Sequence, residues 1–197
     1  PVCMNKVLVT GGAGFIGSHL VDALVGKGVE VVILDDLSTG KRENIAHHTS
    51  GVTFIDGDVS DASRVAQAAE GVDVIFHLAA IASVQKSIEE PLMVHRVNTQ
   101  GTLAVFDAAK KLGVKKVVYA SSSAVYGDVP GLPKDETMPC CPKTPYGLQK
   151  MIGEGYAKLY GELHQLSSVG LRFFNVFGPR QDASSPYSGV ISIFKER

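Results

Sequence analysis

The sequence predicts an α/β fold, a doubly wound parallel sheet of about six strands with helices on both faces. Short apolar runs rich in β-branched residues alternate with helical patterns along the chain, and repeated strand–helix–strand units of this kind build parallel sheets. A glycine-rich turn directly follows the first run, as at the ligand site of such sheets. No repeat or linker divides the chain, so we expect one domain over residues 4–197 and take residues 1–3 as a cloning remnant.

The elements follow from the apolar pattern. The expected strands cover residues 6–10, 30–34, 52–55, 73–76, 116–120 and 169–173, short apolar runs typical of strands buried on both faces. The expected helices cover residues 18–26, 62–69, 91–112 and 145–165, with Gly113 as the stop of the third. Residues 128–144 contain four prolines, so we expect an irregular surface loop that borders the site.

Composition narrows the class of function. The formal net charge of −1 and the charged content of 20% give no reason to expect nucleic acid or an anionic membrane as partner. No apolar run approaches the roughly 18 residues of a membrane span. No charged n-region is followed by an apolar h-region, so we expect no secretory signal. The chain has three cysteines, Cys3, Cys140 and Cys141, and none are spaced as CxxC. An odd number with this spacing does not suggest a set of disulfides, so we expect a cytoplasmic protein. We expect no metal ion at its site.

The glycine turn is the first candidate site. The predicted strand at 6–10 runs into Gly11, Gly14 and Gly17, the GxxGxxG spacing of the short-chain dehydrogenase type. Glycines allow a tight turn and close approach of the backbone, and the helix that follows points N–H groups and a partial positive charge at an anion. This pattern predicts a pyrophosphate site. The alternative is a glycine-rich turn without a ligand.

Polar residues follow two later strands. Asp35 lies 18 residues after Gly17, near the position of the carboxylate that binds the adenosine ribose. Its charge disfavours a 2′-phosphate, which favours NAD over NADP, although a solvated strand end is the alternative. Asp58 is positioned either to bind the adenine amino group or to cap the next helix. Ser60 is a second candidate for that cap. Small residues at 78–80 leave room for a flat cofactor.

A tyrosine and a lysine supply the chemistry. Tyr146 and Lys150 are four residues apart, so they share one face of the predicted helix. A free tyrosine has a pKa of about 10, and a nearby ammonium together with a nicotinamide cation lowers it toward that of a usable base. Ser123, at the end of the fifth predicted strand, is positioned to bind the same substrate oxygen. The alternatives are an ordinary helix surface and a polar turn.

These motifs together resemble one family. TGGAGFIG (10–17), LDDLSTG (34–40), GDV (57–59), HLAA (77–80), Asn98, SSSAVYG (121–127), YGLQK (146–150) and LRFFNVFGPRQ (171–181) occur in order. They resemble the extended short-chain dehydrogenase/reductase family, whose fold is the Rossmann fold. Within it the chain is most similar to the nucleotide-sugar 4-epimerases of the UDP-glucose and UDP-N-acetylglucosamine type.

The resemblance implies a role for each matching position. It implies a catalytic triad of Ser123, Tyr146 and Lys150. The implied NAD contacts are Gly11, Gly14, Phe15, Ile16, Gly17, Asp35, Asp36, Ser38, Thr39, Gly40, Asp58, Val59, Leu78, Ala79, Ala80, Ala82, Asn98, Ser121, Tyr146, Lys150 and Phe173. The implied contacts to a UDP-sugar are Ser83, Ser123, Tyr146, Asn175, Gly189 and Val190. Ile81 and Ala82 depart from relatives that carry a polar residue and a lysine there.

The same resemblance favours one reaction. Related 4,6-dehydratases and decarboxylases carry an acid directly after the catalytic hydroxyl, whereas Ala124 and Val125 follow Ser123 here. We therefore expect epimerisation at C4: hydride transfer to NAD, proton removal by Tyr146, rotation of the 4-keto sugar and return of the hydride to the opposite face. Other chemistry of the family, namely dehydration, decarboxylation or reduction, is one alternative.

The relatives continue beyond the position of Arg197 into a small lobe that closes over the sugar. We therefore read the chain as C-terminally truncated, and an NAD-binding module without turnover is the second alternative. Loss of the lobe would expose a sheet edge and an apolar surface, and self-association would cover them. We expect a homodimer.

Overall fold

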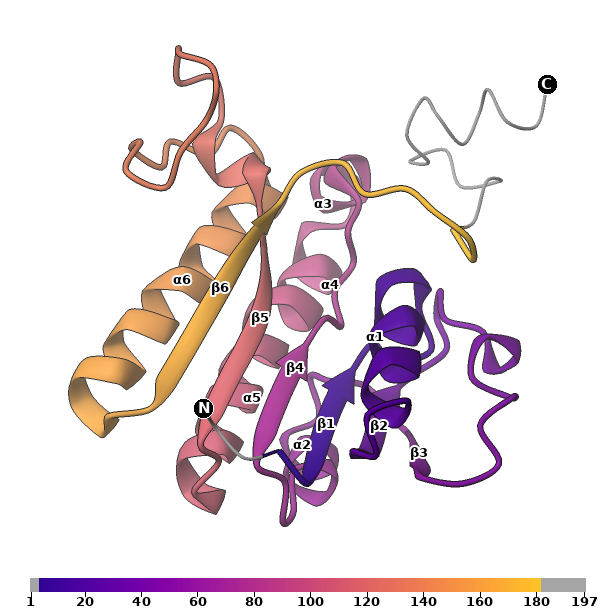
Figure 1. Cartoon of the computed structure of the whole chain (residues 1–197). Helices are drawn as coiled ribbons and strands as arrows, with labels where there is room; N and C mark the ends of the chain where they lie inside the picture. Colours follow the sequence, from indigo (N-terminus) through magenta and orange to yellow (C-terminus); the bar gives the residue numbers. More distant parts are fainter. Residues whose placement is uncertain (1–3, 182–197) are drawn as a thin grey trace, which may run out of the picture.

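The structure is a computed structural model of the chain, and its description covers residues 4–181. Six parallel strands form one sheet in the order β3-β2-β1-β4-β5-β6 (Figure 1). This confirms the predicted fold class. The strands are β1 (Lys6–Thr10), β2 (Glu30–Asp35), β3 (Val52–Asp56), β4 (Val74–His77), β5 (Lys116–Ser122) and β6 (Ser167–Phe173).

The helices cover both faces of this sheet. They are α1 (Phe15–Val25), α2 (Ala62–Ala68), α3 (Val84–Glu89), α4 (Pro91–His95), α5 (Gly101–Leu112) and α6 (Pro145–His164). The predicted helix 91–112 is a continuous run in which the π-helical turn Arg96–Gln100 separates α4 from α5, and Gly113 ends it in the left-handed conformation. Two 3-10 turns, Arg42–Asn44 and Ser123–Tyr126, and the short α3 were not predicted.

Two cores lie on opposite faces of the sheet, because successive strand side chains point to opposite sides. Leu8 of β1 packs with residues of α2, α5 and α6, where Phe106 of α5 is fully buried. Val7 and Val9 belong to the other core, together with Val21 of α1. Full burial of each such side chain contributes about 1.5–3 kcal/mol. Cover on both faces explains why the central strands are apolar at nearly every position.

The strand order reverses between β1 and β4. The chain moves outward from β1 through β2 to β3, then returns to β4 and moves outward through β5 to β6. The carboxyl ends of β1 and β4 therefore lie next to each other, with Thr10 opposite His77 in register. In open parallel sheets ligands bind at such a switch point. The glycine turn and the segment 78–83 both start there.

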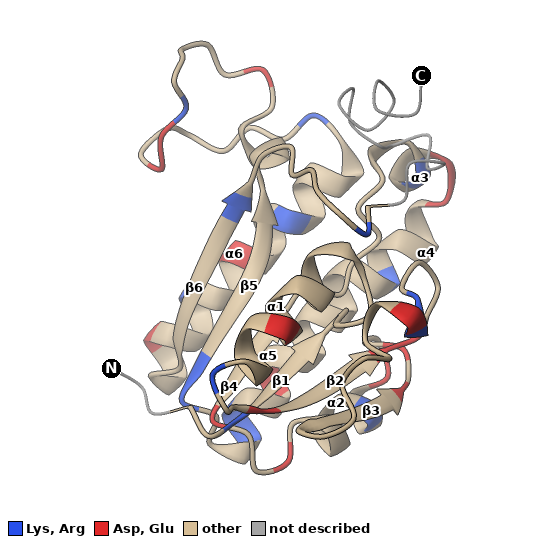
Figure 2. Cartoon of the chain, turned by 45° about the vertical axis from the view of Figure 1, so that its right-hand side comes forward, with Lys and Arg blue, Asp and Glu red and all other residues tan. Residues whose placement is uncertain are grey.

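Charged residues of both signs occur throughout the fold. Lys and Arg are interspersed with Asp and Glu along the ribbon in Figure 2. Residues 128–144 contain no helix or strand and project as a loop between β5 and α6, as the prolines predict (Figure 1). Among residues 4–181, no helix combines the length and apolar character that a membrane crossing requires.

Candidate active site

The glycine turn packs closely against its neighbours. Gly11 has a φ of 71°, and a Cβ there would lie 2.8 Å from the backbone nitrogen of Ala79. A Cβ at Gly17 would overlap the carbonyl oxygen of Gly11. Gly14 caps α1 without a side-chain hydrogen bond, and the first turn of α1 contains no acidic residue. The N-terminal N–H groups of this helix are therefore left without a capping side chain, an arrangement that suits an anion.

Asp35 joins the end of β2 to this turn. Its carboxylate is 7% exposed and accepts hydrogen bonds from the backbone N–H groups of Ala13 (2.9 Å) and Leu37 (2.9 Å). Burial raises the pKa of Asp35, and these two N–H groups oppose the shift without cancelling it. Each carboxylate oxygen keeps a further lone pair, so the structural contacts leave capacity for a ribose hydroxyl.

The segment after β2 wraps around the same turn. Asp36 accepts hydrogen bonds from the backbone and hydroxyl of Ser38, within the exposed stretch that also holds Thr39. A Cβ at Gly40 would lie 2.8 Å from Oδ1 of Asp35, so only glycine fits this approach. The predicted ribose-side residues therefore surround the carboxyl end of β2 in one compact group.

Asp58 does not cap the following helix. Asp61 is the N-cap of α2 and accepts from the backbone of Ser63 and Arg64, so the alternative in which Asp58 or Ser60 caps this helix is wrong. Instead, Asp58 accepts from Nη1 of Arg96 at 2.8 Å. Burial raises the pKa of Asp58, but hydrogen bonds from Ser60 and the charge of Arg96 outweigh it and leave the pKa below its usual value.

Val59, expected beside adenine, is 4% exposed and belongs to the core that α2, α5 and α6 share. A Cβ at Gly101, the first residue of α5, would lie 2.7 Å from Cγ1 of this valine. The side chain of Val59 therefore packs inward against α5.

The tyrosine and the lysine lie on one face of α6, as predicted. Burial raises the pKa of Tyr146, and a hydrogen bond with Ser122 opposes this only in part. The lowering that we predict depends on a bound nicotinamide cation as well as on Lys150, so it stays a prediction. Lys150 lies with Nζ 5.8 Å from the centroid of the Tyr146 ring and donates to the carbonyl oxygen of Ala120 at 2.9 Å. Burial lowers the pKa of Lys150 to about 8.

Ser122, one residue before the predicted Ser123, is the serine whose hydroxyl lowers the pKa of Tyr146, and the role of Ser123 stays a prediction. β5 continues through Ser122, two residues past the end that the apolar run predicts, and Ser123 already begins the 3-10 turn Ser123–Tyr126. The Ser121 hydroxyl donates to Oε1 of Glu154 at 2.6 Å, and the contact of Ser121 with the cofactor stays a prediction. A run of three serines gives no sign of which hydroxyl faces the site, because that depends on where the strand ends.

Asn98, which lies between α4 and α5, connects the segment after β4 to α6. It lies in the π-helical turn and is 2% exposed. Its Oδ1 accepts from the backbone N–H of Ile81 (2.8 Å), and its Nδ2 donates to the Ile81 carbonyl (3.1 Å) and to Oε1 of Gln149 (3.0 Å). These bonds hold the predicted cofactor segment with Leu78, Ala79, Ala80 and Ala82 against α6. Sequence analysis missed Gln149, since nothing in helical periodicity marks an inward-facing amide.

A buried chain of hydroxyls and an imidazole lies beneath the switch point and was also missed. Thr102 donates to the carbonyl oxygen of Asn98 (2.6 Å), so it accepts from Nε2 of His77 (2.9 Å). Nδ1 of His77 then accepts from the hydroxyl of Thr10 (2.8 Å), which itself accepts from the N–H of Ala79 (3.2 Å). Every donor in this series of hydrogen bonds has one acceptor, so the neutral His77 ring carries its proton on Nε2. Burial, followed by the charge of Lys150, lowers the pKa of His77 to about 3.

The predicted sugar contacts are less clearly assembled. Ser83 is 6% exposed and caps α3 by accepting from the N–H of Lys86 at 2.9 Å. Phe173 ends β6 opposite Ser122, and the exposed Asn175 follows it. The other two predicted contacts, Gly189 and Val190, lie outside the described residues.

The segment after β6 crosses to α1, as Figure 1 shows. The carbonyl oxygen of Pro179 accepts from Nε2 of His19 at 2.9 Å. A Cβ at Gly178 would lie 3.4 Å from the Phe15 ring. Residues 174–181 therefore approach the helix whose N-terminus faces the switch point.

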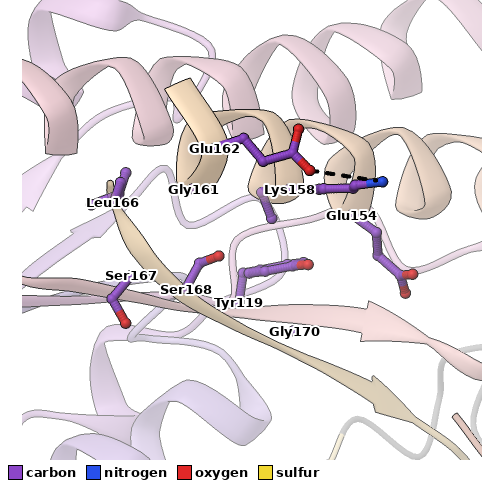
Figure 3. A pocket seen from close by; sticks show the side chains of 10 residues that line it. Tyr119, Glu154, Lys158, Gly161, Glu162, Leu166, Ser167, Ser168 and Gly170 are labelled. Atoms are coloured by element: carbon purple, nitrogen blue, oxygen red, sulfur yellow. Dashed lines mark ion pairs between the residues drawn. The ribbon is translucent and has the colours of Figure 1, made fainter. Parts of the chain in front are cut away.

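A groove between α6 and β6 lies apart from these residues. Figure 3 shows the Lys158–Glu162 ion pair at its rim, with Tyr119, Glu154 and Gly170 below it. Burial raises the pKa of Tyr119 to about 12, so this phenol stays protonated at neutral pH. The lining contains none of the predicted site residues, so the groove is not the candidate active site.

The chain also matches a known protein family over nearly its whole length. Residues 7–197 match the profile of the NAD dependent epimerase/dehydratase family. The chain belongs to that family. Among curated relatives in the family, it is 44% identical over 195 residues to the UDP-glucose 4-epimerase of Mycolicibacterium smegmatis, covering 97% of this chain and 62% of that protein.

Solved structures of relatives agree with the fold. The UDP-N-acetylglucosamine 4-epimerase from Methanobrevibacter ruminantium M1, in complex with UDP-N-acetylmuramic acid, superposes with a TM-score of 0.93 at 46% identity. The UDP-glucose 4-epimerase of Thermus thermophilus, in complex with NAD, gives 0.90 at 45% identity. Each comparison covers 98% of this chain and 62% of the other. The chain thus spans about three fifths of the length of these relatives.

Proposed function

We propose that this chain binds NAD at the switch point and carries the catalytic residues of a nucleotide-sugar 4-epimerase. The observation that carries the proposal is the grouping of Ser122, Tyr146 and Lys150 at the carboxyl end of β5. They lie in the same sheet whose β1 end bears the glycine turn. The chain covers about three fifths of the length of its relatives. The activity and the substrate are therefore proposed for a longer protein that contains this chain.

The described residues fit a dinucleotide. The uncapped start of α1 and the glycines whose Cβ atoms would overlap backbone suit a pyrophosphate. Asp35 is held rigidly by Ala13 and Leu37 with its carboxylate oxygens beside Gly40, where it would accept from the ribose hydroxyls. NAD, when bound, supplies the hydride acceptor for oxidation at C4.

The side chains would handle the proton. Tyr146 would take it from the C4 hydroxyl, while Ser122 holds the phenol oxygen and binds the same sugar oxygen. Burial alone keeps the Tyr146 phenol protonated, since it raises the pKa. Positive charge is therefore required to favour the phenolate. Lys150, whose lowered pKa of about 8 still leaves it mainly charged at pH 7, would supply part of it.

Epimerisation is favoured over elimination by the residues around the hydroxyl. With the catalytic hydroxyl assigned to Ser122, the next two residues are Ser123 and Ala124, and neither is an acid. A dehydratase needs an additional acid and base to expel water from the 4-keto sugar, whereas oxidation and re-reduction at one carbon need neither. Placing the catalytic hydroxyl at Ser122 rather than at Ser123 therefore leaves the expected reaction unchanged.

The proposed substrate is a UDP-hexose, and the proposed assembly is a homodimer. Ser83 and Asn175 stay candidates for the sugar contacts, as do Gly189 and Val190. Leu148, Leu159 and Leu163 of α6 are 46%, 48% and 67% exposed. A second copy of the chain packed on this helix would cover them.

Turnover of UDP-glucose tests the proposal. We expect the chain to bind NAD, the longer protein that contains it to form UDP-galactose, and Tyr146→Phe to lower this turnover at least about 100-fold with NAD affinity nearly unchanged. Tyr156→Phe, on the same helix but in the core, is the matched control and should keep full activity. Ser122→Ala should lose far more activity than Ser123→Ala.

Three results would contradict the proposal in different ways. Full turnover by Tyr146→Phe would remove the role of this phenol. A 4-keto-6-deoxy product would identify a dehydratase. NAD binding without turnover in wild type and both tyrosine variants would identify a binding module.

A further inference from the structure

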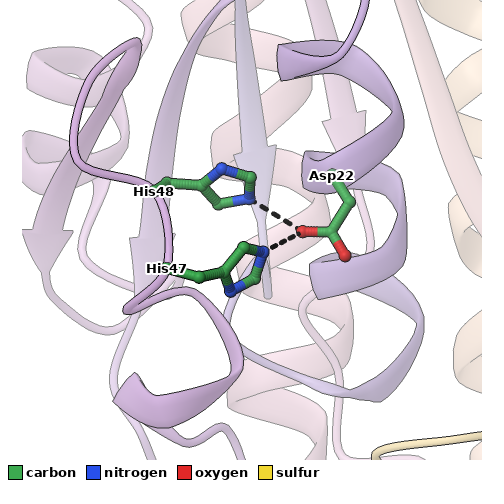
Figure 4. A group of neighbouring side chains, drawn as sticks. All are labelled: Asp22, His47 and His48. Atoms are coloured by element: carbon green, nitrogen blue, oxygen red, sulfur yellow. Dashed lines mark hydrogen bonds and ion pairs between the residues drawn. The ribbon is translucent and has the colours of Figure 1, made fainter.

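Two neighbouring histidines converge on one aspartate outside the candidate active site (Figure 4). His47 and His48 follow the 3-10 turn Arg42–Asn44, and Asp22 lies on α1. The Nε2 atoms of His47 and His48 lie 2.8 Å and 2.7 Å from the same oxygen, Oδ1 of Asp22. The three donor atoms lie within 4.8 Å of one another. None of these residues takes part in the proposed reaction.

This donor set matches a transition-metal site. Two imidazole nitrogens and one carboxylate oxygen are ligands that Zn²⁺ prefers, each at about 2.0–2.2 Å from the ion. Ligand atoms around a tetrahedral ion are then about 3.3 Å apart. The two separations from Oδ1 of Asp22 would have to open by roughly half an ångström, which small rotations of the side chains allow, since those of His47 and Asp22 are 49% and 30% exposed. We propose that Asp22, His47 and His48 bind a divalent transition metal of the Zn²⁺ class, with a fourth position left to water.

The carboxylate of Asp22 is charged at neutral pH, because the ordinary pKa of an aspartate is about 3.9. Arg180 contacts the other oxygen, with Nη2 2.7 Å from Oδ2, and so leaves Oδ1 to the ion. Its positive charge opposes a cation nearby, so the proposed site binds with moderate affinity, and removal of the guanidinium strengthens binding.

The ion would act on the segment that surrounds the glycine turn. The carbonyl oxygen of Ala13 accepts from the N–H of Lys41 (3.0 Å) and from Nδ2 of Asn44 (2.8 Å). The same segment ends at His47 and His48, so it is attached to the turn at one end and to α1 at the other. A metal bridging His47, His48 and Asp22 would replace two hydrogen bonds by coordination and stabilise this segment.

Metal titration of the untagged, EDTA-treated chain tests the proposal without NAD or substrate. We expect Zn²⁺ to bind at one ion per chain in calorimetry, and Co²⁺ to give visible absorption bands of a low-coordinate site. His47→Ala and His48→Ala should each weaken binding at least about tenfold. His95→Ala, an exposed histidine at the end of α4, is the control and should not change it. Arg180→Gln should strengthen binding several-fold.

Circular dichroism of each variant shows whether it is folded. Equal metal affinity in wild type and in the folded double variant His47→Ala/His48→Ala would overturn the proposal, as would absence of one-to-one binding in wild type. Asp22→Asn gives an independent check, because an amide can keep the hydrogen bonds but is a poor ligand. Metal binding undiminished in Asp22→Asn would exclude the carboxylate from the site.

Discussion

The two helices that build the candidate active site begin in opposite ways. α1 begins at Gly14 with no side-chain cap, while α6 begins with Thr144, whose hydroxyl accepts from the N–H of Gly147 at 3.1 Å, and with Pro145 in the first turn. The first helix offers backbone N–H groups to a ligand, so a cap would compete with its function. The second presents Tyr146 and Lys150, so its start must be fixed in place.

The two regions accordingly depend on different residue types. Around α1 the requirement is absence of side chains, since Cβ atoms at Gly11 and Gly17 would collide with backbone. Around α6 the requirement is complementary side chains, since Asn98 and Gln149 hold the helix to the segment from β4. Substitution by alanine should therefore be harmful around α1 because it adds a side chain, and around α6 because it removes one.

The largest effect is expected at the glycine turn. Gly17→Ala places a Cβ against the carbonyl oxygen of Gly11, and backbone cannot rotate away as a side chain can. We expect a loss of more than about 3 kcal/mol in the free energy of unfolding and loss of NAD binding, measured by denaturation and calorimetry. Gly155→Ala in α6, where a Cβ meets nothing within 4 Å, should instead stabilise by about 0.5–1 kcal/mol. Equal stability of the two variants would contradict the close packing of the turn.

The stability of the fold should depend on pH through His77, which ends β4 between the two regions. His77 stays neutral in the folded chain down to a pH of about 3, because burial and the charge of Lys150 lower its pKa. The unfolded chain takes up a proton near pH 6.5, so between these values the unfolded state holds more protons. The free energy of unfolding should fall as the pH drops below about 6.5, with a contribution approaching about 1.4 kcal/mol per pH unit.

Urea denaturation at several pH values measures this contribution when wild type is compared with His77→Asn. All other ionisable groups are shared, so the difference between the two slopes belongs to His77. Parallel curves for the two proteins between pH 4 and 6 would show that His77 is not held neutral.

The smallest effect is expected at the start of α6. Thr144→Ala removes the cap from the N–H of Gly147 and should cost about 1 kcal/mol. Thr144→Ser keeps the hydroxyl and should lie within a few tenths of a kcal/mol of wild type. If serine were as harmful as alanine at this position, the methyl group rather than the cap would hold the helix.

Much of the fold could be predicted because its signals are local. The apolar run at residues 6–10 matches β1 in both bounds, and the glycine spacing marks the turn that follows. The pattern at 91–112 predicts a helix correctly, but the π-helical turn inside it depends on where Asn98 finds partners. β5 runs two residues past the apolar run that predicts it, because pairing with β6 extends it through Ser122.

By itself the sequence determined the strand–helix alternation, the glycine turn, and the tyrosine and lysine that share a helix face, because each depends on residues a few positions apart. Only the tertiary structure decided which distant polar groups meet. Thr10 reaches His77 across 67 positions, and Asn98 reaches Gln149 across 51. Strand order and register bring such groups together, and buried polar atoms must then pair with whatever the neighbouring element presents. Periodicity records which face a residue occupies, but not which partner occupies the other side.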